Sequence, residues 1–139
     1  GILVVGHGSR RAEANDDIRD AAEKIQRRGD FDLVEAAFLE IASPNIAAGF
    51  AKLVERGARH IIVHPYFLSP GRHTRGDIPV EVAAAAEQHS GVTYQITEPL
   101  SAHPSVIEAS VERIKNVQKR SLNAAEKGVV YLVGAGPGD

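Results

Sequence analysis

The chain has 139 residues, of which 43% are hydrophobic and 24% charged, a composition that fits one globular domain and argues against disorder. Its net charge of −2 excludes a polybasic binder of nucleic acid or of a membrane surface. Cysteine is absent, so thiolate ligands are excluded. We see neither a signal peptide nor an apolar run of the roughly 20 residues that span a membrane, so we expect a cytoplasmic protein. Because Gly1 leads directly into an apolar run, we also expect a piece of a longer polypeptide.

Short β-rich runs alternate with longer helical patterns along the chain. The predicted strands are residues 2–5, 33–39, 60–63, 92–96 and 129–133. Apolar residues spaced as on one helix face predict the helices, which we place around residues 18–25 and 46–54, from residues 77–79 to 89, and after residue 104. Strand and helix repeated four times predict an α/β fold. We expect a small doubly wound, flavodoxin-like parallel sheet with helices on both faces.

Proline and glycine mark the expected helix ends. Ser43 is predicted to cap the second helix, with Pro44 as its first residue. Gly29, Gly57 and Gly91 stand where helices should end, because glycine adopts the backbone conformation that closes a helix.

Residues that bind metals follow three of the predicted strands. His7 comes after the first strand, Glu40 after the second, and His73 lies in the long loop after the third. In such sheets the ligand binds outside the carboxyl ends of the strands, near the point where strand order reverses. Two imidazoles and a carboxylate suit Co²⁺, Ni²⁺, Fe²⁺ or Zn²⁺, so we predict a divalent metal site there.

Each candidate also has a simpler interpretation when taken alone. His7 or Ser9 could cap the first helix, Glu40 could be a solvated strand end, and His73 an exposed loop residue. Their joint placement at one edge of the sheet favours the metal site over these interpretations.

The other four histidines are weaker candidates. His64 ends the third strand, where a buried, hydrogen-bonded histidine is the better interpretation. His103 precedes Pro104 and suits the start of a helix at least as well as a ligand. His60 and His89 lie at the opposite ends of their elements, and we expect both on the surface.

The loops after the first and third strands are rich in arginine, with Arg10, Arg11, Arg72 and Arg75. Guanidinium groups near one edge of an acidic protein indicate an anionic ligand with carboxylate or phosphate groups. Arg11 and Arg75, taken singly, are better interpreted as solvated surface residues.

No nucleotide-binding motif is complete in this sequence. Gly6, His7 and Gly8 follow a strand and open a helix, but Arg11 stands where the third glycine of a dinucleotide fingerprint belongs. The sequence contains no Walker lysine motif, so it gives no support for ATP-driven chemistry.

A series of motifs resembles those of the sirohydrochlorin chelatases. In chain order they are residues 5–10 (VGHGSR), 37–40 (AFLE) with Pro44, 65–68 (PYFL) with 71–73 (GRH), 77–79 (DIP) and 98–100 (EPL). Members of this family insert cobalt or iron into sirohydrochlorin without ATP. The resemblance implies that His7, Glu40 and His73 hold the metal and catalyse its insertion, and these are the residues that strand order also selects.

The resemblance also implies the ligands and the assembly. Sirohydrochlorin carries many carboxylates, for which the expected binding residues are Ser9, Arg10 and Arg72. The divalent ion is a substrate, and the ligand set suits Co²⁺, Fe²⁺ and Ni²⁺ alike. One small domain offers one wall for a broad tetrapyrrole, so we expect a homodimer. The residues at 66–68 are candidate dimer contacts, unless they pack over the sheet edge.

The end of the chain carries a second resemblance. Residues 129–139 resemble the opening strand and loop of the S-adenosylmethionine-dependent uroporphyrinogen III methyltransferases. We therefore expect a chelatase domain at residues 1–120, a linker at 121–128 and the truncated start of a methyltransferase-like domain at 129–139. The full polypeptide would then be a fusion of two enzymes.

Two other functions remain open from the residues alone. A non-catalytic cobalt or nickel carrier would use the same histidines and glutamate without turnover, and a phosphohydrolase could use His7 or His73 as its nucleophile. The long loop from Tyr66 to Gly76 and its arginines favour a bulky anionic substrate over a simple carrier.

Overall fold

The structure is a computed structural model, and it describes residues 1–69, 71–101 and 103–126. The side chains of residues 72–74 and 124–126 are outside this description, as is the predicted strand at 129–133. The chain divides into two compact units, residues 1–99 and residues 100–139, and each is considered by itself.

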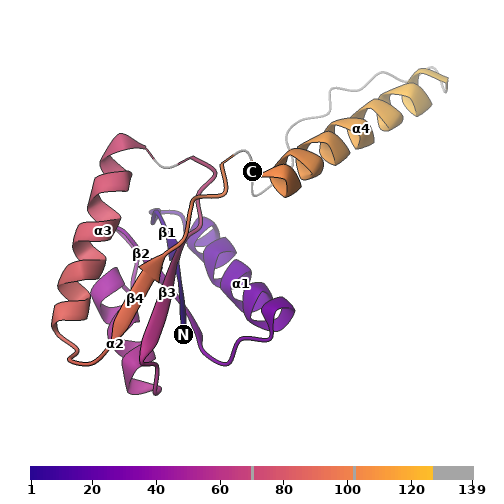
Figure 1. The fold of residues 1–139 in the computed structure, drawn as a ribbon. Coiled ribbons are helices and arrows are strands. Elements are labelled where there is room, and N and C mark those ends of the chain that lie inside the picture. The colour runs from indigo at the N-terminus through magenta and orange to yellow at the C-terminus, as the bar shows by residue number, and fades with distance from the viewer. Residues whose placement is uncertain (70, 102, 127–139) are drawn as a thin grey trace. The chain divides into compact units, whose positions relative to one another are not determined.

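The described part of the first unit is built on a parallel sheet (Figure 1). Its strands are β1 (Ile2–Gly6), β2 (Val34–Phe38), β3 (His60–Pro65) and β4 (Thr93–Ile96), arranged in the order β2-β1-β3-β4. The register sets Val4 between Ala36 of β2 and His64 of β3. Strand order reverses between β1 and β3, so the carboxyl ends of these two strands form the edge where a ligand is expected.

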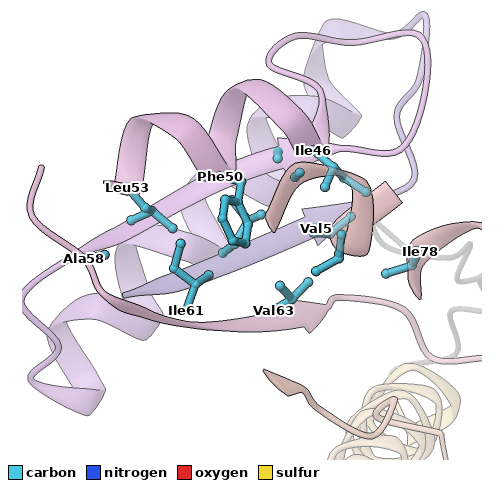
Figure 2. Packing of buried hydrophobic residues seen from close by; sticks show 12 residues of the cluster. Val5, Ile46, Phe50, Leu53, Ala58, Ile61, Val63 and Ile78 are labelled. Carbon is cyan, nitrogen blue, oxygen red and sulfur yellow. The ribbon is translucent and has the colours of Figure 1, made fainter. Parts of the chain in front are cut away.

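Helices α2 (Ile46–Glu55) and α3 (Arg72–Glu87) cover one face of the sheet. Figure 2 shows Phe50 and Leu53 of α2 close to Ile61 of β3. These three side chains and Val5 of β1 are fully buried. This is the larger of the two hydrophobic cores in the described residues. Leu3 and Val5 of β1 point into it, because every second residue of a strand points to the same face.

Helix α1 (Ala12–Gly29) covers the opposite face. Ala22 is buried there against Ile2 and Val4 of β1 and Val34 of β2. Because alternate residues of β1 enter different cores, the strand is apolar throughout and buried on both faces. The prediction of a doubly wound parallel sheet with helices on both faces is confirmed.

The second unit contains α4 (Pro104–Glu126), so residues 121–126 of the predicted linker region are helical. At its start, Nδ1 of His103 accepts a hydrogen bond from the Ser105 N–H at 3.0 Å. This confirms the interpretation of His103 as a residue of the helix start. None of the described helices combines the length and hydropathy that crossing a membrane requires.

The prediction for the start of α2 is wrong. Asn45, not Ser43, caps this helix, because its Oδ1 accepts the Ala48 N–H at 2.8 Å and the first helical residue is Ile46. Pro44 belongs to the edge of the sheet instead, since its carbonyl accepts the N–H of Phe38 at 2.9 Å. A contact between separate segments thus overrides the local Ser-Pro signal.

The prediction for the start of α3 is also wrong. The helix begins at Arg72, well before Asp77, and the Arg75 N–H already donates to the Gly71 carbonyl at 3.0 Å. Pro79 therefore lies inside the helix, where it leaves the carbonyl of Arg75 without a helical donor. The glycine signals hold better, since Gly57 and Gly91 adopt positive φ just after α2 and α3.

Candidate metal and substrate site

His7 and Glu40 meet because the pairing of β1 with β2 continues past the strand ends. The Leu39 N–H donates to the Gly6 carbonyl at 2.9 Å, and the Glu40 N–H donates to the His7 carbonyl at 3.1 Å. The side chains follow their backbones, so Nδ1 of His7 lies 3.6 Å from Oε1 of Glu40. The strand-end argument therefore identifies two polar side chains that lie together at the carboxyl edge.

The distance between these two atoms suits joint coordination of one ion. Ligand atoms that are each about 2.0–2.2 Å from a metal lie at most about 4.4 Å apart. The separation of 3.6 Å satisfies this limit, and both side chains are more than half exposed. An ion or a large ligand can thus approach both groups from solvent.

Phe67 packs against the imidazole of His7 in an edge contact. The ring centroids are 6.1 Å apart with the ring planes at 72°. Phe67 is half-buried against the larger core, so it packs at the sheet edge, the second of the two roles expected for residues 66–68. This contact with Phe67 restricts the orientation of the His7 ring. The sequence did not predict the contact.

Asn15 fixes the backbone of the loop that carries His7. Its Oδ1 accepts the Ser9 N–H at 2.9 Å, and its Nδ2 donates to the Ser9 carbonyl at 2.7 Å. Asn15 is the buried polar residue of α1. The sequence did not predict that a residue inside the helix would hold this loop. The hydroxyl of Ser9 accepts the Arg11 N–H at 3.1 Å, so Ser9 takes part in the helix start, while Arg10 is exposed.

His73 and Arg72 lie in the first turn of α3 rather than in a loop. Their side chains are outside the described part of the chain, so their predicted roles remain predictions. Among the side chains that are described, no group of three histidines and carboxylates gathers around one point. His7 and Glu40 are thus the two members of the predicted set whose side chains the structure brings together.

The remaining histidines have structural partners. Nδ1 of His64 is 2.7 Å from the Thr97 hydroxyl, and burial lowers the pKa of His64 from its usual 6.5. His60 is exposed, with its ring nitrogens near Thr93 and Gln95. His89 is half-buried, contrary to the expected surface position, because its ring stacks on Phe50 at 5.8 Å.

Comparison with known proteins agrees with this architecture. The CbiX family model matches residues 1–117. This chain belongs to the CbiX family. It is 39% identical to the chloroplastic sirohydrochlorin ferrochelatase of Arabidopsis thaliana over 116 residues, which are 84% of this chain and 52% of the relative. It is 31% identical to the sirohydrochlorin cobaltochelatase of Methanopyrus kandleri, with 82% of this chain and 94% of the relative covered.

Solved structures of family members have the same fold. The sirohydrochlorin chelatase SirB of Bacillus subtilis subspecies spizizenii, in complex with cobalt, superposes with a TM-score of 0.77 at 34% identity. The match covers 84% of this chain and 50% of SirB. This chain therefore spans about half the length of several relatives it matches, whereas it covers nearly all of the Methanopyrus protein.

Proposed function

We propose that this protein inserts a divalent metal ion, cobalt or iron, into sirohydrochlorin without a nucleotide. The observation that carries the proposal is the approach of His7 and Glu40 at the reversal point of the sheet, with 3.6 Å between Nδ1 and Oε1. Family membership supports it, because relatives named as sirohydrochlorin chelatases match most of this chain. Ni²⁺ suits the same ligands and is a further candidate substrate.

The proposed reaction needs metal ligands and a proton acceptor at one place. The ion must exchange water for the four macrocycle nitrogens, and two pyrrole N–H protons must leave. We assign His7 and His73 as ligands that hold the ion from one side, and Glu40 as a ligand or an acceptor for a proton. The bonds from the ion to nitrogen replace its bonds to water, which gives a reason why ATP is not required.

The expected substrate-binding residues are Ser9, Arg10 and Arg72, at the rim of the same edge. Guanidinium groups pair with carboxylates in a fixed two-pronged geometry, and sirohydrochlorin carries many carboxylates. The exposed position of Arg10 supports this assignment, since a rim residue has to reach into solvent.

Visible spectroscopy with sirohydrochlorin and Co²⁺ tests the function. We expect the spectral change of metalation to be faster with the protein than with the metal alone. Binding of Co²⁺ without faster metalation would instead identify a carrier. Release of phosphate from a phosphomonoester by His7 would identify a phosphohydrolase, and either result would overturn the proposal.

We further propose that the protein acts as a homodimer. Helix α4 carries exposed apolar residues at Ile107, Val111, Ile114, Val117 and Leu122, a spacing that leaves one side of the helix apolar. The charges along it run from Glu108 and Glu112 near its start through Arg113, Lys115, Lys119 and Arg120, with Glu126 at its end, so its start is acidic and its middle is basic. This charge pattern matches a second copy of the same helix in antiparallel orientation, which is the occupant we propose.

Sedimentation at micromolar concentration tests the dimer. We expect about twice the chain mass for the wild type. Ile114→Glu should shift the protein towards the monomer, whereas Asn116→Glu should not, because it adds the same charge at a polar position of the helix. A wild-type monomer that still metalates sirohydrochlorin would contradict this proposal.

The domain division is also part of the proposal. We place the chelatase domain at residues 1–120, a connection at 121–128, and the start of a methyltransferase-like domain at 129–139, which lies outside the described residues. The full polypeptide would then join two reactions on related tetrapyrroles in the cytoplasm. The mass of the protein in its natural source, together with its partition on cell fractionation, tests these points.

A further inference from the structure

A small apolar pocket opens beside the carboxyl end of β3. Its volume is about 120 Å³, and its walls include Pro65 of β3, Ile78 of α3, and Ile96 and Pro99 at and after the end of β4. Arg75 borders it and is the charged residue among the described side chains that line it. The hydroxyl of Thr97, also in the lining, is bonded to His64. The pocket is thus an apolar space with one cation at its border.

The pocket lies on the same sheet edge as His7 and Glu40. Pro65 is paired in register with Val5 of β1, two residues before His7, and the Tyr66 N–H donates to the Val5 carbonyl at 2.8 Å. The ends of β3 and β1 are therefore neighbours. A broad ligand centred on one can extend over the other.

We propose that this pocket binds one carboxylate-bearing side arm of the tetrapyrrole and that Arg75 pairs with its carboxylate. This inference rests on the proposed function, since it takes sirohydrochlorin as the ligand. Arg75 is exposed, so its guanidinium can meet a carboxylate that arrives from solvent. The inference assigns Arg75 a role in substrate binding, whereas the sequence taken alone favours a solvated surface arginine.

The size and lining of the pocket fit an arm and not a ring. A dry protein cavity of about 150 Å³ accepts benzene, so a pocket of about 120 Å³ holds a chain of two or three carbons. Apolar walls favour burial of the methylene groups, while the cation at the border favours the carboxylate. An arm anchored in this way would restrict the position of the tetrapyrrole along the carboxyl edge of the sheet.

Steady-state kinetics of Arg75→Gln test the inference. We expect the KM for sirohydrochlorin to rise about tenfold, with kcat changed less than about twofold, because the contact is made equally before and during metal insertion. The KM of Arg75→Lys should lie between those of the wild type and Arg75→Gln, since lysine keeps the charge but loses the two-pronged geometry. Binding of Co²⁺ alone should be unchanged in both variants, which shows that the metal site is intact.

Arg59→Gln is the matched control. Arg59 is exposed and precedes β3, at the opposite end of the strand, so the variant removes the same charge far from the pocket. The methyl ester of sirohydrochlorin is a second control, and it should bind equally to the wild type and to Arg75→Gln. The pocket inference is wrong if Arg75→Gln and Arg59→Gln have the same effect on KM. It is also wrong if the methyl ester binds the wild type more tightly than it binds Arg75→Gln. If the wild type neither binds nor metalates sirohydrochlorin, the proposed function itself is wrong.

Discussion

Gly8 lies directly against the backbone carbonyl of Glu40, so closely that a Cβ atom on Gly8 would overlap the carbonyl oxygen. Gly8 also has a φ of +100°, which side chains with a Cβ rarely adopt. Both features accompany the hydrogen bond from the Glu40 N–H to the His7 carbonyl. The glycine after His7 therefore allows the loop after β2 to approach within the distance at which the two side chains meet.

We predict that Gly8→Ala separates His7 from Glu40. The added methyl group must displace the Glu40 backbone, and the positive φ adds a strain of about 1–3 kcal/mol. Calorimetric titration with Co²⁺ should show an affinity at least about tenfold lower, and thermal unfolding should show a lower midpoint. Gly76→Ala is the control, because a Cβ there meets no atom of the described residues within 4 Å and its helical backbone accepts alanine. Wild-type Co²⁺ affinity in Gly8→Ala would contradict the prediction.

We predict that Asn15→Ala loosens the loop of residues 7–10. The variant loses both bonds to the Ser9 backbone and leaves a half-buried N–H and carbonyl without their partner, at a cost of about 2–3 kcal/mol in the free energy of unfolding. Because this loop carries His7, the affinity for Co²⁺ should fall as well. Urea unfolding and Co²⁺ titration measure the two effects separately.

Gln26→Ala is the matched control for Asn15→Ala. Gln26 lies near the other end of α1, and its Nε2 donates to the Asp32 carbonyl at 3.1 Å. Its loss should lower stability slightly and leave Co²⁺ affinity unchanged. If both variants lower the affinity alike, Asn15 has no special role in holding the loop.

The parallel sheet and the edge at which its loops lie could be predicted from sequence, but the close approach of two of these loops could not. A residue that follows a parallel strand lies at one edge of the sheet, and this rule alone places His7 and Glu40 on the same side. The contact of Gly8 with Glu40 depends on the register of β1 and β2 beyond the strand ends. The two hydrogen bonds of Asn15 depend on the orientation of α1 relative to the loop that precedes it. Neither this orientation nor the contact of Gly8 produces a periodic pattern of residues in the sequence.

We predict different outcomes for substitutions of the two site residues. His7→Ala should abolish chelation, because it removes a ligand that no neighbour replaces in the described site. Glu40→Gln should keep part of the Co²⁺ affinity but slow metalation, since an amide oxygen can bind the ion and cannot accept a proton at neutral pH. Titration and single-turnover metalation separate the two steps. His60→Ala is the control, an exposed histidine at the amino end of β3. Equal loss of binding and turnover in Glu40→Gln would argue against a role in proton transfer.

The environment of His64 predicts how stability depends on pH. Burial lowers its pKa below the usual 6.5, and the ring is bonded to the Thr97 hydroxyl at 2.7 Å. Between the lowered pKa of the folded protein and 6.5, the unfolded chain binds more protons at this residue than the folded protein does. The contribution of His64 to the free energy of unfolding therefore rises with pH through this window and falls as the pH drops below 6.5.

We predict that His64→Asn removes this part of the pH dependence. Asparagine places an amide near the position of Nδ1, so it can keep a hydrogen bond with Thr97 while it no longer titrates. Urea unfolding between about pH 5 and about pH 7.5 should give a shallower decline of stability for the variant on the acid side. The difference between the two curves on the acid side reports how far burial lowers the pKa of His64. About one pH unit above 6.5, where His64 is largely neutral in both the folded and the unfolded chain, the two curves should become parallel. A constant offset across the whole range would show that protonation of His64 does not oppose folding.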